Sequence, residues 1–340
     1  MIDMKSIPWK YGKSYRQLSF DVLVPSGANV DIVVPSCSAI PLPGREERVG
    51  PISIHVGGGG AISAVGLAQL GLKPAVWGIV GNDTLGRFVE EELVESGVAA
   101  FLERSGTEST GVSLAFNPET DRSFITWDGS CTDFQMDRIP LELVKASRHV
   151  HFTGYRGRSN HRALAAAIAT AKRSNCTISL DTGWDDSGEW YEGFFELADA
   201  VDVVFCNGPE AQQFTRSHDV EEALGRLLRL SSTCAVKLGA EGSLALREGE
   251  IYRCPAFTVK VVDTTGAGDS FNAGFLYGFL YDLELEDCLV LGNACGAISV
   301  TKAGGATASP NREELEAFLR ERDRLPARWE RMAAANGGRA

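Results

Sequence analysis

The sequence predicts a three-layer α/β domain, in which helices cover a mainly parallel sheet, together with a small β-sheet lid. From Ser19 onward, apolar runs rich in β-branched residues alternate with longer stretches of helical period, which is typical of parallel sheets. A second group of short strand-like segments is confined to the first 130 residues. The 340 residues, 44% hydrophobic and 23% charged, suffice for one large globular domain or two ordinary ones.

The elements of the main sheet follow from these runs. Each apolar run is short and bounded by turn residues, as buried strands are, and each helical stretch carries apolar residues three or four apart. The predicted strands are Phe20–Val24, Ala75–Ile79, His149–Phe152, Thr177–Leu180, Val201–Cys206 and Cys234–Lys237. The predicted helices are Ala61–Leu70, Thr84–Ser96, His161–Ser174, Pro209–Arg216, Val220–Leu230, Asp269–Tyr281, Leu285–Thr301 and Arg312–Arg322.

The lid is expected from about 31–56 and 111–127, where Pro, Gly and charged turns separate short strands. We place an N-terminal extension at residues 1–18, the folded domain at 19–325 and a C-terminal tail at 326–340. The predicted lid strands are Asp31–Val34, Ser53–Val56, Gly111–Phe116 and Ser123–Trp127.

The overall charge and the cysteines exclude several classes of protein. A formal charge of -12 argues against a general binder of nucleic acids or anionic membranes, because both need a basic surface. No run reaches the eighteen or so apolar residues of a membrane helix, and the N-terminus lacks a signal peptide's apolar stretch. The eight cysteines form no C-x-x-C pair, so we expect reduced thiols and a cytoplasmic protein.

The strongest chemical signal is the string Val-Val-Asp-Thr-Thr-Gly-Ala-Gly-Asp-Ser-Phe at residues 261–271. Gly266, Ala267 and Gly268 expose backbone N–H groups at the start of a helix, whose N-terminus carries partial positive charge. This arrangement suits the spread negative charge of a phosphoryl group in transfer. Asp269 can accept the proton of an attacking hydroxyl, although Asp also commonly caps helices.

Other nucleotide-binding motifs are absent from the sequence. There is no Gly-x-x-x-x-Gly-Lys-Ser/Thr, which excludes a P-loop enzyme. The glycine run 57–60 lacks the Gly-x-Gly-x-x-Gly spacing of a dinucleotide-binding fold, and the five histidines show no metal-ligand spacing.

With these motifs the chain resembles the ribokinase and phosphofructokinase-B family of sugar and nucleoside kinases, whose C-terminal signature reads Asp-Thr-x-Gly-Ala-Gly-Asp. The resemblance spans about Phe20 to Glu316 and implies a ribokinase-like sandwich with a β lid. The matching segments are Gly57–Ala61, Gly71, Gly78–Gly86, Gly97–Val98, Asn207–Glu210 and Val236–Gly242.

The resemblance implies roles for individual residues around ATP. Asp269 is then the general base, and residues 266–268 form the anion hole. Asn207 and Glu210 would organise Mg²⁺ and its waters, Glu210 acting through water, as suits an ion that keeps much of its hydration. The positions matching the family's ATP site are Lys237, Gly239, Gly242 and Asn293, and those linked to a monovalent cation such as K⁺ are Asp263 and Thr265.

The resemblance also implies a sugar site. Asn29 and Asp31 match the family's first-strand Asn-x-Asp, whose carboxylate accepts hydrogen bonds from vicinal hydroxyls, although Asn and Asp also favour turns. Gly58 and Gly59 would let the backbone approach the sugar. Where ribokinase-like members commonly carry Asn, two residues after the glycine run, this chain has Ile62, which argues against assuming ribose.

Side chains on the lid and after the third strand leave the substrate open. Tyr155, Arg156 or Arg158 can point into the site, as can Arg122; an arginine there would suit an acidic substrate, and each is equally a surface-loop residue. Trp127 and Phe124 can form the slot of a nucleoside kinase or serve as packing. We therefore expect an ATP-dependent kinase acting on a sugar or sugar derivative. The alternatives are a nucleoside kinase or, from another class, a non-catalytic sensor; pairing of lids would make a homodimer.

Overall fold

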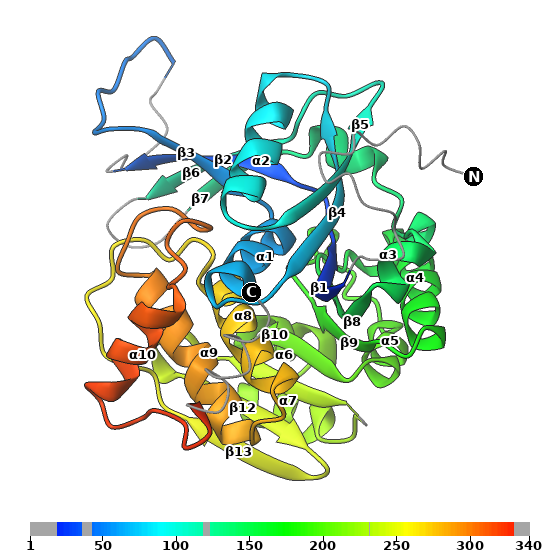
Figure 1. Ribbon diagram of the computed structural model, residues 1–340, viewed down its shortest axis with the longest axis vertical. Coiled ribbons are helices and arrows are strands. Elements are labelled where there is room, and N and C mark those ends of the chain that lie inside the picture. Colours follow the sequence, from blue (N-terminus) through cyan, green and yellow to red (C-terminus); the bar gives the residue numbers. More distant parts are fainter. Residues whose placement is uncertain (1–18, 36–42, 118–122, 231, 330–340) are drawn as a thin grey trace.

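The computed structural model describes residues 19–35, 43–117, 123–230 and 232–329. Within them the main sheet has the order β13-β12-β11-β10-β9-β8-β1-β4-β5. In this spatial order, each adjacent pair from β11 across to β5 is parallel. Strands β12 and β13 add an antiparallel hairpin at the other edge, next to β11 (Figure 1). The strands are β1 (Phe20–Pro25), β4 (Pro74–Gly81), β5 (Ala99–Ser105), β8 (Ser147–Phe152), β9 (Thr177–Asp181), β10 (Val203–Asn207), β11 (Thr233–Lys237), β12 (Ser243–Arg247) and β13 (Glu250–Cys254).

Helices cover both faces of this sheet, as predicted, because the central strands are apolar on both sides. In β10, for example, Phe205 packs into one hydrophobic core whereas Val204 and Cys206 pack into the other. One face carries α1 (Gly59–Gln69), α2 (Thr84–Glu95), α8 (Ala267–Leu280), α9 (Leu285–Ser299) and α10 (Arg312–Arg320). The other carries α3 (Leu141–Lys145), α4 (His161–Arg173), α5 (Phe194–Ala200), α6 (Gly208–Thr215) and α7 (Val220–Leu227).

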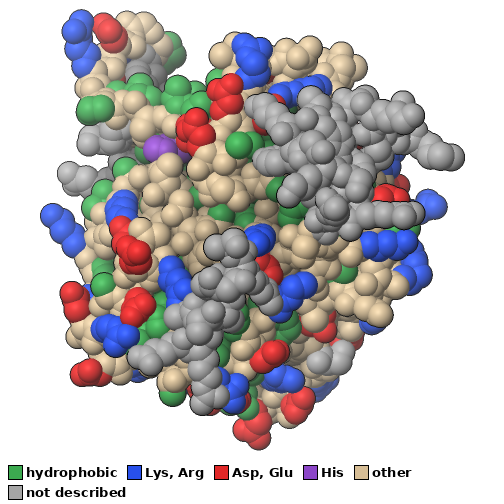
Figure 2. Space-filling view, in the orientation of Figure 1, with side chains coloured by type: hydrophobic (Ala, Val, Ile, Leu, Met, Phe, Trp, Pro, Cys, Tyr) green, Lys and Arg blue, Asp and Glu red, His purple; other side chains and the backbone are tan. Residues whose placement is uncertain are grey.

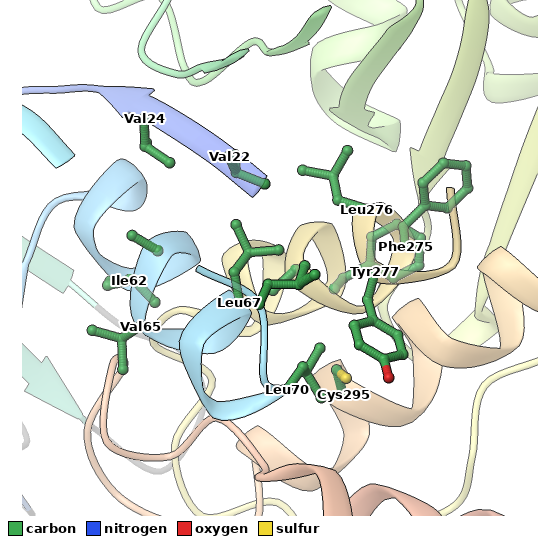
Figure 3. Close-up of a cluster of buried hydrophobic side chains, with 14 of the residues drawn as sticks. Val22, Val24, Ile62, Val65, Leu67, Leu70, Phe275, Leu276, Tyr277 and Cys295 are labelled. Carbon is green, nitrogen blue, oxygen red and sulfur yellow. The ribbon is translucent and has the colours of Figure 1, made fainter. Parts of the chain in front are cut away.

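The first core fixes α1 between the sheet and α8. Figure 3 shows Val22 and Val24 of β1 on one side of Leu67 and Leu70, with Phe275 and Tyr277 of α8 beyond them. All six side chains are nearly inaccessible to solvent. This packing places the first turn of α1 beside the first turn of α8, where the Gly57–Gly60 run and the Gly-Ala-Gly-Asp string lie.

The predicted lid is present as a separate four-stranded sheet with the order β3-β2-β6-β7. It projects from the main domain at the upper left of Figure 1. Strands β2 and β6 are parallel, whereas the outer pairs are antiparallel. The strands are β2 (Asn29–Pro35), β3 (Ser53–Gly57), β6 (Val112–Asn117) and β7 (Ser123–Trp127).

Some elements were not predicted. Strands β5, β12 and β13 and the short helices α3 and α5 are missing from the predicted set, and α8 begins at Ala267, two residues earlier than predicted. The β12–β13 hairpin turns at Glu248 and Gly249, which have φ of 52° and 84°. Positive φ at both central residues suits a two-residue hairpin turn.

The folded domain also reaches beyond the predicted boundary at residue 325. Trp329 is buried, and its indole donates a hydrogen bond to Glu316 of α10 at 2.8 Å. Its ring lies 6.0 Å from that of Tyr277 in α8. The predicted extension at residues 1–18 lies outside the described residues, as does most of the tail.

Candidate active site

The site is built around Asp269, which lines two cavities. The lid cavity, of about 530 Å³, lies between the lid and the carboxyl ends of β1, β8 and β9. The C-terminal cavity, of about 760 Å³, lies between the carboxyl end of β11, the 256–261 segment and helices α8 and α9. Ligands of open α/β sheets bind at the carboxyl ends of the strands, which is where both cavities open. A group at Asp269 is therefore accessible from both sides.

The backbone around Asp269 forms a small-residue helix start. Gly266 occupies the N-cap position of α8 with φ of 70°, so Asp269 is the third residue of the helix and not its cap. A side chain at Gly266 would place its Cβ 2.9 Å from Gly305, and this position therefore requires glycine. Gly266, Ala267 and Gly268, the residues of the expected anion hole, all line the C-terminal cavity. Their N–H groups begin a 14-residue helix.

Asp269 has an unusual pKa for a carboxyl group. Removal from water raises the pKa, and the negative charges of Asp181 and Asp31 raise it further, whereas Lys237 opposes them; the result is about 7. A carboxyl that titrates near neutral pH is a stronger base than an ordinary aspartate and is suited to proton transfer.

Lys237 lies in a hydrogen-bonded network that was not predicted. Its ammonium is 2.9 Å from Asp181 Oδ1 and 3.2 Å from Asn272 Oδ1, while Asn272 donates to the other oxygen of Asp181 at 2.9 Å. Burial disfavours the ammonium, but Asp181, Glu210 and Asp269 outweigh it and raise the pKa of Lys237. Lys237 lines the C-terminal cavity and Asp181 lines the lid cavity, so this pair forms part of the wall between them.

The predicted magnesium residues form the start of α6. Asn207 Oδ1 accepts from the N–H of Glu210, and Glu210 Oε2 accepts from the N–H of Asn207, which is a reciprocal capping box. Thr182 also donates to Glu210 Oε2 at 2.8 Å. Burial and the charge of Asp181 raise the pKa of Glu210. Asn207 lines the C-terminal cavity, whereas Glu210 is buried behind it.

The remaining residues of the predicted ATP site converge on the C-terminal cavity. Gly239 and Gly242 line it after β11, and Asn293 lines it from α9. The Asn293 side chain donates to the carbonyls of Cys254 and Pro255 at 3.0 and 3.2 Å, so it anchors the segment that follows β13. Other apolar residues of the lining were not predicted because no motif marks them: Phe257, Val259, Ala297 and Val300. Val261 and Phe271, which also line the cavity, are the ends of the 261–271 string.

The predicted cation residues, Asp263 and Thr265, are buried beside this cavity. Asp263 Oδ1 accepts from both the N–H and the hydroxyl of Thr265, at 2.9 and 2.7 Å. Asp263 Oδ2 accepts from the N–H of Gly304 at 3.0 Å. The carboxylate thus joins the start of the 263–266 turn to the loop after α9. No group of three or more potential His, Cys, Asp or Glu metal ligands occurs among the residues with described positions.

The lid cavity brings together most of the predicted substrate residues. Asn29 and both Gly58 and Gly59 line it, and Asn29 Nδ2 donates to Asp31 Oδ1 at 3.2 Å. Gly58 has φ of 90°. A Cβ on Gly59 would lie 2.8 Å from Asp269 Oδ1, so only glycine lets the start of α1 approach this carboxylate so closely. Asp31 is buried beside the cavity rather than in its lining.

Of the loop and lid candidates, the structure separates those in the cavity from those outside it. Arg156 and Trp127 line it. Tyr155 is buried among aromatic rings of α5 and α6, and Arg158 binds Glu189 away from the cavity. Phe124 is half exposed and is absent from the lining, and Ile62 packs in the core. Arg122 lies outside the described residues.

Comparison with known proteins identifies the family. The model of the pfkB family of carbohydrate kinases matches residues 28–320. The chain belongs to the pfkB family of carbohydrate kinases. The predicted enzyme class and the ribokinase-like fold are thereby confirmed.

Individual relatives differ in their named substrates. A 5-dehydro-2-deoxygluconokinase of Listeria monocytogenes is 26% identical over 324 residues, covering 90% of this chain and 98% of the relative. An adenosine kinase structure from Sinorhizobium meliloti is 29% identical with a TM-score of 0.77, covering 89% of this chain and 99% of its own. A ribokinase structure from Thermotoga maritima is 27% identical with a TM-score of 0.74, covering 88% and 99%. Across the described residues we find no helix with the length and apolarity needed to cross a membrane.

Proposed function

We propose that this pfkB-family kinase transfers the γ-phosphoryl group of ATP to a hydroxyl of a substrate held in the lid cavity, with Asp269 as general base. The observation that carries this proposal is the position of the Asp269 carboxyl, which lines both cavities. A hydroxyl in the lid cavity and a phosphate in the C-terminal cavity can meet only beside this group.

ATP fits the C-terminal cavity by its shape and lining. The glycines after β11 and the first turn of α8 offer backbone N–H groups to phosphates, and the apolar residues of α9 and the 256–261 segment suit a base. Lys237 places a positive charge beside this helix start, because a Cβ on Gly268 would lie only 3.4 Å from its ammonium. The γ-phosphoryl group would then lie against residues 266–268.

Mg²⁺ fits the donors at the end of β10. Asn207 exposes an amide to the cavity and Glu210 offers a carboxylate behind it, both hard ligands of the kind this ion prefers. Because Glu210 already accepts from Thr182 and Asn207, we assign it to waters of the ion and not to direct ligation. Bound there, Mg²⁺ would neutralise charge on the phosphates.

The K⁺ role proposed for Asp263 and Thr265 is tested by comparing turnover in potassium and tetramethylammonium salts.

The substrate is proposed to be a sugar or sugar derivative bound by Asn29 and Asp31. The Asn29 amide lines the cavity with Gly58 and Gly59, and the buried carboxylate of Asp31 accepts a hydrogen bond from it; such oxygens suit vicinal hydroxyls, which donate hydrogen bonds. A nucleoside kinase is the second candidate, and the specific observation in its favour is Trp127 in the lining, which offers a face on which a base can stack. A non-catalytic sensor is disfavoured because the carboxylate and the helix start are both in place.

We further propose that the protein forms a homodimer through its lids and works in the cytoplasm. One face of the lid carries a row of cross-strand partners, Ile54, Ile32, Leu114 and Ile125. Ile54 and Ile125 are about half exposed, whereas Ile32 packs against the first core. Figure 2 shows hydrophobic side chains gathered on this part of the molecule. Apolar patches on otherwise polar surfaces mark contact sites. The described cysteines are all free thiols, which suits a reducing compartment.

The deciding experiment is ADP release by the purified protein with MgATP and a panel of sugars, sugar acids, sugar phosphates and nucleosides. At least one compound should stimulate ADP release strongly. With that compound, Asp269→Asn should lower kcat by about 100- to 10,000-fold while ATP affinity, measured by calorimetry, changes little. Near-normal kcat in Asp269→Asn would refute the base assignment, and ATP binding without turnover on any compound would favour the sensor.

A further inference from the structure

The charges that line the lid cavity cancel in pairs. Among its described lining residues the charged side chains are Asp128, Arg156, Asp181 and Asp269. Arg156 contacts both oxygens of Asp128, with each nitrogen–oxygen distance 3.3 Å. Asp181 is neutralised from the C-terminal cavity side by Lys237 at 2.9 Å. Asp269 is thus left as the unbalanced charge of the lining.

The Arg156–Asp128 pair also connects the lid to the main domain. Asp128 directly follows β7 of the lid, and Arg156 lies in the loop between β8 and α4. The loop itself is held in shape, because Asn160 accepts from the N–H of Arg156 and donates to the carbonyl of Gly154. The guanidinium is therefore presented to Asp128 by a fixed loop, and the half-exposed bidentate contact balances the charge that would otherwise attract a substrate carboxylate.

The rest of the lining is neutral and of two kinds. Asn29, Thr126, Thr132 and Thr153 provide polar groups for hydroxyls. Trp127, Phe134 and Met136 provide apolar surface. The Phe134 ring packs against that of Trp77, with ring centroids 4.8 Å apart. Such a cavity matches a polyol that has an apolar ring face.

We propose that the acceptor substrate is a neutral polyol, a free sugar or nucleoside, and that the Arg156–Asp128 pair is a specificity determinant that excludes sugar acids and sugar phosphates. This inference rests on the proposed kinase function. An anionic substrate would lose its hydration beside Asp269 without gaining an unpaired cation, and uncompensated transfer of a charge out of water is costly. A neutral polyol meets no such cost. The relative named 5-dehydro-2-deoxygluconokinase would then differ in substrate charge.

The test compares matched pairs of substrates that differ only in charge. ADP release by the full chain is measured with each aldose and its aldonic and uronic acid, and with each nucleoside and its 5′-monophosphate. In the wild-type protein, kcat/KM for the preferred neutral compound should exceed that for its charged partner by at least about 100-fold. A wild-type preference for the acid or the phosphate would overturn the inference while leaving the kinase function intact.

Two variants test the ion pair itself. Asp128→Asn frees Arg156. The ratio of kcat/KM for the neutral compound to kcat/KM for its acid should then fall by about tenfold, since one opposing charge is removed. Arg158→Gln is the matched control, because Arg158 lies two residues away and binds Glu189 outside the cavity; its ratio should equal the wild-type ratio. An unchanged ratio in Asp128→Asn would overturn the role of the pair. Absence of turnover with every compound would overturn the kinase function and this inference together.

Discussion

The carboxyl of Asp269 combines two properties that single residues rarely share. It lies where two cavities meet, and its pKa is near 7 because burial and the charges of Asp181 and Asp31 oppose ionisation. A base with this pKa changes its protonation within the physiological range, so its neighbours control the fraction of enzyme that is competent.

The pH dependence of activity should report this control. Because the base must be ionised, kcat/KM should rise with pH through about 7 in the wild-type protein. Asp181→Asn removes a negative charge and frees Lys237, and both changes lower the pKa of Asp269. In Asp181→Asn the rising limb of the kcat/KM–pH profile should therefore move to lower pH. Asp186→Asn, which changes an exposed carboxylate in the loop after β9, is the control and should leave the rising limb in place.

Asp269 should also cost stability above neutral pH. Its pKa is raised on folding, so the folded state favours the protonated form, and its contribution is most favourable below the unfolded pKa and is lost as pH rises through about 7. Asp269→Asn should therefore raise the free energy of unfolding by about 1–3 kcal/mol at pH 8 and by much less at pH 4. Denaturant titrations at the two pH values measure this. An equal effect at both would contradict the pKa assignment.

At the residue scale, what the sequence can reveal depends on how local the signal is. Asp269 was predicted because its chemistry is encoded by contiguous residues. Asp181 was not, because its importance arises from contacts with Lys237 and Asn272, which are 56 and 91 positions away. A polar residue directly after an apolar strand was the available signal, and it is a weak one.

Close contact between α8 and α9 depends on glycines. A Cβ on Gly274 would lie 2.5 Å from the carbonyl oxygen of Leu291, and a Cβ on Gly292 would lie 2.7 Å from the Phe271 ring. Gly274 therefore lies directly against the backbone of α9, and Gly292 lies directly against a side chain of α8. Since α8 carries Asp269 at its start, this packing also fixes the direction in which the base enters the site.

Substitution of these glycines should distinguish packing from helix propensity. Gly274→Ala should lower the free energy of unfolding by about 1–3 kcal/mol through overpacking. Gly225→Ala in α7 is the control: its Cβ meets no atom within 4 Å, so it should raise stability by about 0.5–1 kcal/mol through better helix propensity. Both values come from denaturant unfolding. Stabilisation by Gly274→Ala would contradict the close packing.

Helices and strands were predictable where the hydrophobic period and the flanking turn residues indicate the same element. The six predicted strands of the main sheet and the four lid strands are all present, because apolar runs and turn residues mark them locally. The β12–β13 hairpin was missed although Glu248-Gly249 separates two alternating segments, and β5 was missed because Ala99–Ser105 mixes apolar and charged residues. Their pairing partners, which decide their structure, lie elsewhere in the chain.

At the scale of the whole molecule, the lid has two distinct faces. Asp31 and Ser113 lie on one face, whereas Ile54 and Ile125 lie on the other, because side chains alternate along each strand. The same sheet can therefore close over a substrate and contact a second copy of the chain. No local motif predicts such an association, which explains why the sequence left it open.

Disruption of the face that carries Ile54 and Ile125 should change the state of association. Ile54→Lys/Ile125→Lys should convert a dimer into a monomer in sedimentation-velocity experiments, since the two charges would be buried unpaired in the contact. Ile251→Lys on β13, another exposed isoleucine, should leave the sedimentation coefficient unchanged. A wild-type protein that sediments as a monomer at micromolar concentration would refute the lid dimer.

The anchoring of the segment after β13 has a consequence for the kinetic mechanism. Asn293 holds the carbonyls of Cys254 and Pro255, and Gly242 lies against the same segment, so two walls of the C-terminal cavity are fastened directly to one another. The nucleotide can thus associate and dissociate whether or not the other reactant is present. This arrangement favours random order of addition over a sequence in which sugar must enter first, so ATP should bind to the protein in calorimetry without any sugar present.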